Sequence, residues 1–205
     1  MHPLIIVDIQ FGFVPGGALE VPGGDEIIPI VNKLQESFSL VVATQDWHPK
    51  GHKSFASNHP GKKPFERIQL HGLDQVLWPD HCVQGSHGAE LHKSLNVNNV
   101  EAIFRKGMDA DIDSYSGFFD NGYKKSTGMA GYFRERKITK VFVCGLAADY
   151  CVFYTAKDAL KENFETYIIE DATRAIDPNG FANAKEEILS TGGQVIQTGT
   201  LHKHL

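Results

Sequence analysis

The chain has 205 residues, 41% of them apolar, which is enough material for one well-buried core. We therefore expect residues 1–205 to form a single domain. The formal net charge of −5 and the lack of a basic arm argue against nucleic acid as a partner. The longest apolar run, residues 141–148, is far too short to cross a bilayer, so we expect no membrane partner either.

The cysteine content indicates the cellular compartment, and the clustering of histidines indicates the kind of chemistry. The three cysteines, Cys82, Cys144 and Cys151, cannot form a complete set of disulfides, and the N-terminus shows neither a charged leader nor a cleavage site. Both observations favour a cytoplasmic protein. Seven of the ten histidines lie between His48 and His92, which indicates metal or proton chemistry in that half of the chain.

Short apolar runs rich in β-branched residues alternate with segments of helical periodicity. The runs predict strands at residues 4–7, 40–44, 100–104, 141–144, 166–169 and 194–197. The periodic segments predict helices at residues 25–37, 128–137, 150–163 and 180–189. Loops are expected at residues 11–24, 48–88 and 109–126. This alternation is typical of an α/β protein: a single-domain three-layer α/β/α sandwich with a mostly parallel six-stranded central sheet.

Chemically capable side chains stand at four of the predicted strand ends. Asp8 follows the first strand, Asp46 and His48 follow the second, Lys106 follows the third, and a short turn after the fourth leads to Cys151. In open parallel sheets, ligands bind at the carboxyl ends of the strands. Packing alone does not account for such a coincidence, so we expect an active site along this edge.

Cys151 should lie near the first turn of a helix, where free N–H groups and the helix dipole lower the pKa of a thiol. The alternative is a buried structural cysteine, which is common for a lone thiol. Asp8 and Lys106 favour a nucleophile site, because a carboxylate can take the thiol proton and an ammonium stabilises the thiolate. The Asp8 carboxylate opposes the lowering of the thiol pKa, because it disfavours a second negative charge nearby. Cys144, in a buried strand, should be inert.

The run Asp46-Trp47-His48 indicates a metal site. Residues i and i+2 at an extended strand end face the same side, so Asp46 and His48 could hold one cation together. Oxygen and imidazole ligands suit Zn²⁺, Fe²⁺ or Mn²⁺, and His52 and His81 offer further ligands. The alternative is a solvated His-rich loop. Cys82, beside His81, is interpreted as a buried bystander.

Aromatic side chains in the predicted loops are candidates for binding a flat ring. Phe13 and Trp78 could pack in the core or sandwich a planar substrate between their faces. Tyr115 and Tyr150 are further candidates of the same kind.

Taken together, these residues resemble the nicotinamidases, also called pyrazinamidases, within the isochorismatase-like cysteine hydrolases. The most specific runs are Asp46-Trp47-His48-Pro49 and Trp78-Pro79-Asp80-His81-Cys82. The other matching runs are residues 5–10 with Phe13, 54–56, 106–107, 113–116, 145–147 and 149–151.

The resemblance implies hydrolysis of nicotinamide to nicotinate and ammonia, and of pyrazinamide to pyrazinoate, in NAD salvage. It implies a catalytic triad of Asp8, Lys106 and Cys151, and an oxyanion hole formed by the N–H groups of Ala147 and Cys151. It also implies that Phe13 and Trp78 flank the substrate ring and that the metal ligands are Asp46, His48 and His81. Tyr115 and Tyr150 remain substrate-binding candidates from the residues alone. One divalent ion per chain is implied, zinc before iron or manganese. Either His52 or water would complete its shell, and a homo-oligomer is left open.

The resemblance also implies a cis peptide bond between Leu146 and Ala147, and one departure from the family pattern is Ala148, where many members carry Thr. Two alternative functions agree less well with the sequence. Another amide hydrolase of the superfamily would lack the Asp-Trp-His and Trp-Pro-Asp-His-Cys runs. A non-catalytic ligand- or metal-binding member would be expected to lose Asp8, Lys106 or Cys151, and all three are present.

Overall fold

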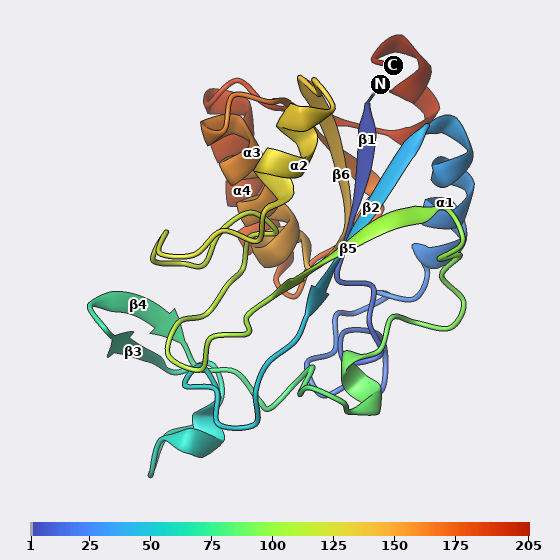
Figure 1. Cartoon of the computed structure of the whole chain (residues 1–205). Coiled ribbons are helices and arrows are strands. Elements are labelled where there is room, and N and C mark those ends of the chain that lie inside the picture. Colours follow the sequence, from blue (N-terminus) through green and yellow to red (C-terminus); the bar gives the residue numbers. More distant parts are fainter. Residues whose placement is uncertain (1) are drawn as a thin grey trace.

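The structure, a computed structural model, describes residues 2–205 and is built around one parallel sheet (Figure 1). The six strands are β1 (Pro3–Val7), β2 (Leu40–Asp46), β5 (Val100–Lys106), β6 (Lys140–Leu146), β7 (Glu165–Arg174) and β8 (Gln194–Ile196). Their order is β5-β2-β1-β6-β7-β8, and every neighbouring pair is parallel. The predicted six-stranded sheet is confirmed.

Both faces of this sheet are covered, so the central strands β1, β2 and β6 are buried at nearly every position. Along β1, Leu4 and Ile6 pack into one hydrophobic core, and Ile5 and Val7 pack into the other. Helix α1 (Ile28–Leu34) covers the first face, together with a 3-10 helix at Thr198–Lys203. Helices α2 (Met129–Glu135), α3 (Phe153–Lys161) and α4 (Pro178–Ser190) cover the second face (Figure 1). The three predicted layers are therefore confirmed.

Several boundaries differ from the prediction. The helix expected from residue 150 begins as a π-helical turn at Ala148–Val152 and continues as α3. Helix α4 begins two residues early, at Pro178, because Asp177 caps it by accepting the backbone N–H of Asn179. Strand β7 runs on to Arg174, and the 3-10 helix that follows β8 was not predicted.

The long loop predicted at residues 48–88 contains a β-hairpin that sequence periodicity missed. Strands β3 (Arg67–Leu70) and β4 (Leu73–Val76) pair antiparallel and lie apart from the main sheet (Figure 1). His71 and Gly72 form the two-residue turn between them, with φ of 50° and 81°. Positive φ at both positions is typical of a type I′ hairpin turn.

The strand order reverses between β1 and β6, so the chain leaves these two neighbours in opposite directions. In open parallel sheets, such a reversal opens a crevice at the carboxyl ends of the strands. Gly145 allows a close approach there, since a Cβ on it would lie 2.1 Å from the carbonyl oxygen of Val7. None of the helices within residues 2–205 is long and apolar enough to cross a membrane.

Candidate active site

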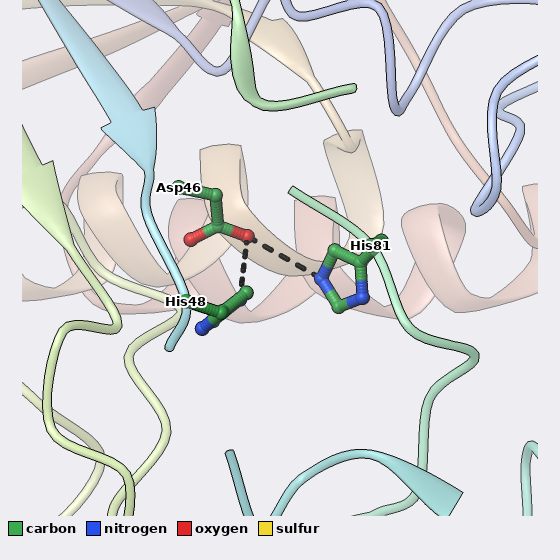
Figure 2. Close-up of side chains that lie close together, drawn as sticks. All are labelled: Asp46, His48 and His81. Carbon is green, nitrogen blue, oxygen red and sulfur yellow. Dashed lines mark hydrogen bonds and ion pairs between the residues drawn. The ribbon is translucent and has the colours of Figure 1, made fainter. Parts of the chain in front are cut away.

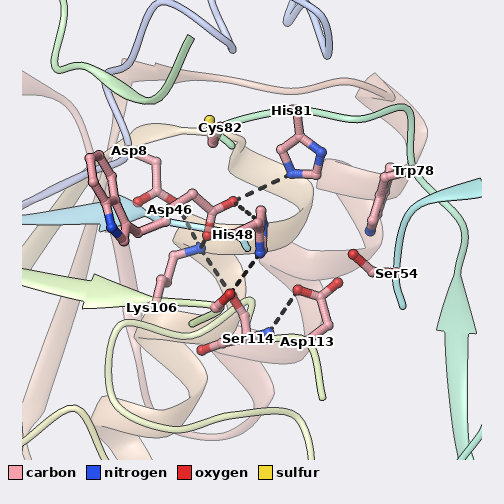
Figure 3. A network of polar contacts seen from close by, with 12 residues as sticks. Asp8, Asp46, His48, Ser54, Trp78, His81, Cys82, Lys106, Asp113 and Ser114 are labelled. Carbon is pink, nitrogen blue, oxygen red and sulfur yellow. Dashed lines mark hydrogen bonds and ion pairs between the residues drawn. The ribbon is translucent and has the colours of Figure 1, made fainter. Parts of the chain in front are cut away.

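Strand register brings the predicted catalytic residues together at this reversal. Asp46 and Lys106 are paired residues at the ends of β2 and β5, and Asp8 directly follows β1. The Lys106 ammonium is fully buried and lies 2.9 Å from Asp8 Oδ2 and 2.5 Å from Asp46 Oδ1 (Figure 3). It also lies 3.4 Å from the Sγ of Cys151 and donates to the Ser114 carbonyl oxygen at 3.0 Å. One cation thus contacts two carboxylates and the thiol.

Burial and mutual attraction fix the charges of the Lys106–Asp46 pair. Burial lowers the pKa of Lys106, but the carboxylates of Asp46 and Asp8 outweigh it and raise the pKa well above its usual value. Burial raises the pKa of Asp46, but Lys106 and His48 hold this pKa well below its usual value. Asp46 is therefore a carboxylate and Lys106 an ammonium at neutral pH.

The expected low pKa of Cys151 is wrong. Burial raises the pKa of this thiol well above its usual value, the carboxylates of Asp8 and Asp46 add to the rise, and Lys106 alone opposes them. Burial likewise raises the pKa of Asp8, only partly offset by Lys106. A thiol that rests protonated needs a base, and a neighbouring carboxylate with a raised pKa is suited to accept its proton.

Asp46, His48 and His81 converge on one point, as Figure 2 shows. The Nε2 atoms of His48 and His81 lie 3.2 Å and 3.5 Å from Asp46 Oδ2. Each imidazole uses its other nitrogen on a backbone carbonyl: His48 Nδ1 donates to Gly107 O at 2.9 Å, and His81 Nδ1 donates to Pro79 O at 2.8 Å. A carbonyl only accepts, so Nδ1 of each ring carries a hydrogen, and in the neutral imidazole Nε2 is the nitrogen whose lone pair can bind a cation. Two lone pairs and a carboxylate oxygen make a donor set that fits a divalent cation.

Gly107 holds the ring of His48 in place. Its φ of +66° lies in the left-handed region, and a Cβ added to it would meet His48 Cε1 at 2.3 Å. A glycine is therefore needed after β5 so that the backbone can lie against the imidazole.

His52 lies beside the Asp46–His48–His81 cluster. Its ring centroid is 4.4 Å from that of His48, and its Nδ1 lies 2.7 Å from Ser54 Oγ. Its Nε2 is buried and has no hydrogen-bond partner within residues 2–205. Burial lowers the pKa of His52 to about 4, so the ring is neutral at pH 7. A ring nitrogen of His52 lies within 4.8 Å of possible ligand atoms of His48 and Asp113, but His52 is not part of the Asp46–His48–His81 group. Its role as a fourth metal ligand therefore stays a prediction.

A pocket opens over Cys151. The four aromatic residues predicted to bind a ring all line this pocket, and so do Cys151 and two of the predicted metal ligands. The complete lining is Phe13, Leu19, Asp46, Trp78, His81, Asp113, Tyr115, Ala147, Tyr150, Cys151 and Ile176. Trp78 and Tyr150 meet edge to face at 4.9 Å. The Leu146–Ala147 peptide bond is cis, as the resemblance implies. The geometry thus provides a largely apolar pocket with the Cys151 thiol in its wall and the Asp46–His48–His81 cluster beside it.

Several residues that hold the site were missed from sequence. The Gln10 side chain binds the backbone of Asp46, accepting its N–H at 2.8 Å and donating to its carbonyl at 2.9 Å. Gln75, on the hairpin, is buried and donates to Asp113 Oδ2 at 2.9 Å. Gln10 had a visible signal in its spacing of two from Asp8, but Gln75 had none, because its strand was not predicted.

Comparison with known proteins agrees with this geometry. Residues 3–200 match the model of the isochorismatase domain family. A nicotinamidase of Acinetobacter baylyi is 52% identical over 95% of this chain and 92% of its own length. A solved nicotinamidase and pyrazinamidase of Acinetobacter baumanii superposes with a TM-score of 0.95 at 50% identity, covering 98% and 97% of the two chains. A pyrazinamidase of Pyrococcus horikoshii, solved in complex with zinc, is 39% identical with a TM-score of 0.79, covering 96% and 98%.

Proposed function

Because the chain belongs to the isochorismatase domain family, among its nicotinamidases, we propose that it hydrolyses nicotinamide to nicotinate and ammonia, and pyrazinamide to pyrazinoate. The observation that carries this proposal is the position of Cys151. Its thiol lines a pocket walled by aromatic side chains and lies 3.4 Å from an ammonium that also contacts Asp8. A flat aromatic amide would meet a nucleophile, a base and a cation in one place.

The proposed reaction has two steps, formation of a thioester and its hydrolysis. Asp8 takes the proton of Cys151 while Sγ attacks the carboxamide carbon, and Asp8 then protonates the departing ammonia. Lys106 keeps Asp8 in position and balances the negative charge of the site. In the second step, Asp8 activates a water that hydrolyses the thioester and regenerates the thiol.

Two groups of residues orient the substrate for this attack. The backbone N–H groups of Ala147 and Cys151 are proposed to stabilise the oxyanion that forms on the carboxamide oxygen. Phe13, Trp78, Tyr115 and Tyr150 hold the ring, since all four line the pocket. Fixing the ring makes the attack effectively unimolecular, a gain of up to about 7–11 kcal/mol of barrier.

Asp46, His48 and His81 are proposed to hold one divalent ion, zinc before iron or manganese, with His52 or water completing its shell. The support is the convergence of their donor atoms and the zinc complex of the Pyrococcus horikoshii relative. When bound, such an ion supplies a Lewis acid for the lone pair of the pyridine nitrogen, directly or through a water.

Ammonia release from nicotinamide tests the activity. The purified protein should release ammonia and nicotinate in equal amounts, and Cys151→Ala should reduce the rate by about 10³-fold or more while keeping fold and ion content. Turnover well above background by Cys151→Ala would refute the covalent mechanism. Activity on N-carbamoyl amides but not on nicotinamide would favour another amide hydrolase of the superfamily, and release from neither would favour a non-catalytic binding protein.

We also propose that residues 1–205 act as one domain and that the enzyme serves NAD salvage in the cytoplasm. All three cysteines are unpaired, and the proposed mechanism needs Cys151 as a free thiol, which a reducing compartment preserves. Sedimentation of the purified protein would decide whether it forms a homo-oligomer.

A further inference from the structure

Thr44, a fully buried residue of β2, contacts Asp8 through a single hydroxyl that makes two hydrogen bonds. Its Oγ1 accepts the backbone N–H of Asp8 at 3.2 Å and donates to Asp8 Oδ1 at 2.6 Å. The first bond fixes the backbone of Asp8, which has a left-handed φ of 48°. The second bond fixes its carboxylate. Thr44 therefore controls both the position and the rotation of the proposed base.

These bonds make the two oxygens of Asp8 different. Oδ1 is occupied by the short hydrogen bond from Thr44. Oδ2 forms the 2.9 Å ion pair with Lys106 Nζ, and no other donor among residues 2–205 contacts it. An oxygen of Asp8 also lies within 4.8 Å of the Sγ of Cys151. Oδ2 is thus the oxygen of this carboxylate that has a lone pair left to receive a proton from the nearby thiol.

Packing fixes the side chain of Thr44 in this orientation. Its Cγ2 methyl lies so close to Gly117 that a Cβ added to that glycine would be 2.7 Å away. Threonine in a strand has a stiff χ1 torsion, so a methyl held against Gly117 keeps the hydroxyl directed at Asp8. Serine would keep the hydroxyl but lose this methyl contact.

We propose that Thr44 is a positioning residue for proton transfer: by binding Oδ1 of Asp8, it presents Oδ2 to the reacting atoms. Oδ2 would receive the proton of Cys151 as the S–C bond forms and give it to nitrogen as the C–N bond breaks. Asp8 then returns to its starting charge, so thiol and amide become thioester and ammonia. The inference rests on the proposed function and deepens it.

Thr44→Val and Thr44→Ser test this role, because valine keeps the shape and serine keeps the hydroxyl. Thr44 does not line the substrate pocket. We therefore expect Thr44→Val to lower kcat for ammonia release by at least about tenfold, with KM for nicotinamide within about twofold of the parent. Thr44→Ser should stay within about threefold of the parent kcat.

A matched control is Thr166→Val. Thr166 is a buried threonine near the start of β7, at the opposite end of the sheet from the site, and its Oγ1 donates to the Phe164 carbonyl oxygen at 2.8 Å. It should keep the parental kcat, and thermal unfolding of both variants separates lost stability from lost catalysis. The role of Thr44 is refuted if Thr44→Val keeps kcat within about twofold, if its KM rises while kcat holds, or if Thr44→Ser falls as far as Thr44→Val.

Gly117→Ala decides the matter if Thr44→Val fails to fold. It leaves the Thr44 hydroxyl in the protein but pushes against the methyl, so kcat should fall although no polar group is lost. An unchanged kcat in a folded Gly117→Ala protein would overturn the proposal. A parent enzyme inactive on nicotinamide would refute the proposed function, whereas an active parent with an unaffected Thr44→Val refutes only the role of Thr44.

Discussion

Replacing Gly107 with alanine tests whether a single backbone position sets the affinity of the cation site. An added Cβ would lie 2.3 Å from His48 Cε1 and 2.5 Å from His48 Nδ1. Carbon atoms in contact prefer separations of about 3.5–4.0 Å, so the ring must move by about 1 Å or more. Such a movement also breaks the 2.9 Å hydrogen bond from His48 Nδ1 to the Gly107 carbonyl oxygen.

The expected effects on ion binding and on stability have separate origins. Loss of the carbonyl that orients a histidine ligand typically costs about 10–100-fold in ion affinity. The left-handed φ of +66° adds about 1–2 kcal/mol to the cost of any residue with a Cβ. We therefore expect Gly107→Ala to bind zinc about 10–100-fold more weakly and to lose at least about 1 kcal/mol in the free energy of unfolding.

Gly61→Ala is the matched control, because Gly61 has a φ of +78° and no heavy atom within 4 Å of its added Cβ. It carries the backbone cost without the clash. Zinc affinity is measured by competition with a chromogenic chelator, and stability by denaturant unfolding of the ion-free proteins. If Gly107→Ala and Gly61→Ala bind zinc equally well, the reasoning about His48 is wrong.

Two further predictions concern the buried charges. Lys106→Met should lower the free energy of unfolding by about 3–5 kcal/mol near pH 7, because it leaves two buried carboxylates unpaired. The pKa of Asp46 is depressed in the fold, so its stabilisation is fully present above its unfolded pKa and is lost as the pH falls through the lower folded pKa. A difference between parent and variant that does not narrow below about pH 4 would contradict this account. In chelator-treated protein, the raised pKa of Cys151 should make labelling by iodoacetamide accelerate beyond pH 9, as read by peptide mapping. A rate that levels off below pH 8 would show a depressed pKa instead, and nicotinate should slow labelling by filling the pocket.

The sheet and the residues at its edge could be predicted because their sequence signals are local. The first, second and fourth strands of the sheet, counted along the chain, each contain an unbroken run of at least four apolar residues, as is typical of strands covered on both faces. Once the strands are parallel, Asp8, Asp46 and Lys106 meet at one edge without any further information. Spacing of two residues likewise sufficed to bring Asp46 and His48 together.

What could not be predicted depends on contacts between distant segments. Each strand of the hairpin has only four residues, which is the lower limit for recognising an alternation of polar and apolar residues. In β4 the alternation is broken by Gln75, which is buried and held by hydrogen bonds to Asp113 and Tyr115. Thr44 is indistinguishable in sequence from any β-branched strand residue. The prediction of a low pKa for Cys151 was wrong because the complete burial of the thiol and the closeness of Asp46, which both raise this pKa, appear only in three dimensions.

Asp46 belongs to both halves of the site, since Oδ1 contacts Lys106 and Oδ2 faces the two imidazoles. Ion binding and proton binding are therefore thermodynamically linked through one carboxylate. Linkage is reciprocal: if an ion at the imidazoles changes the proton affinity of Asp8, then protonation of Asp8 changes the ion affinity by the same factor. Replacing one bound ion by another at Asp46, His48 and His81 should therefore shift the pH–rate profile, although Asp8, the proposed base, is unchanged.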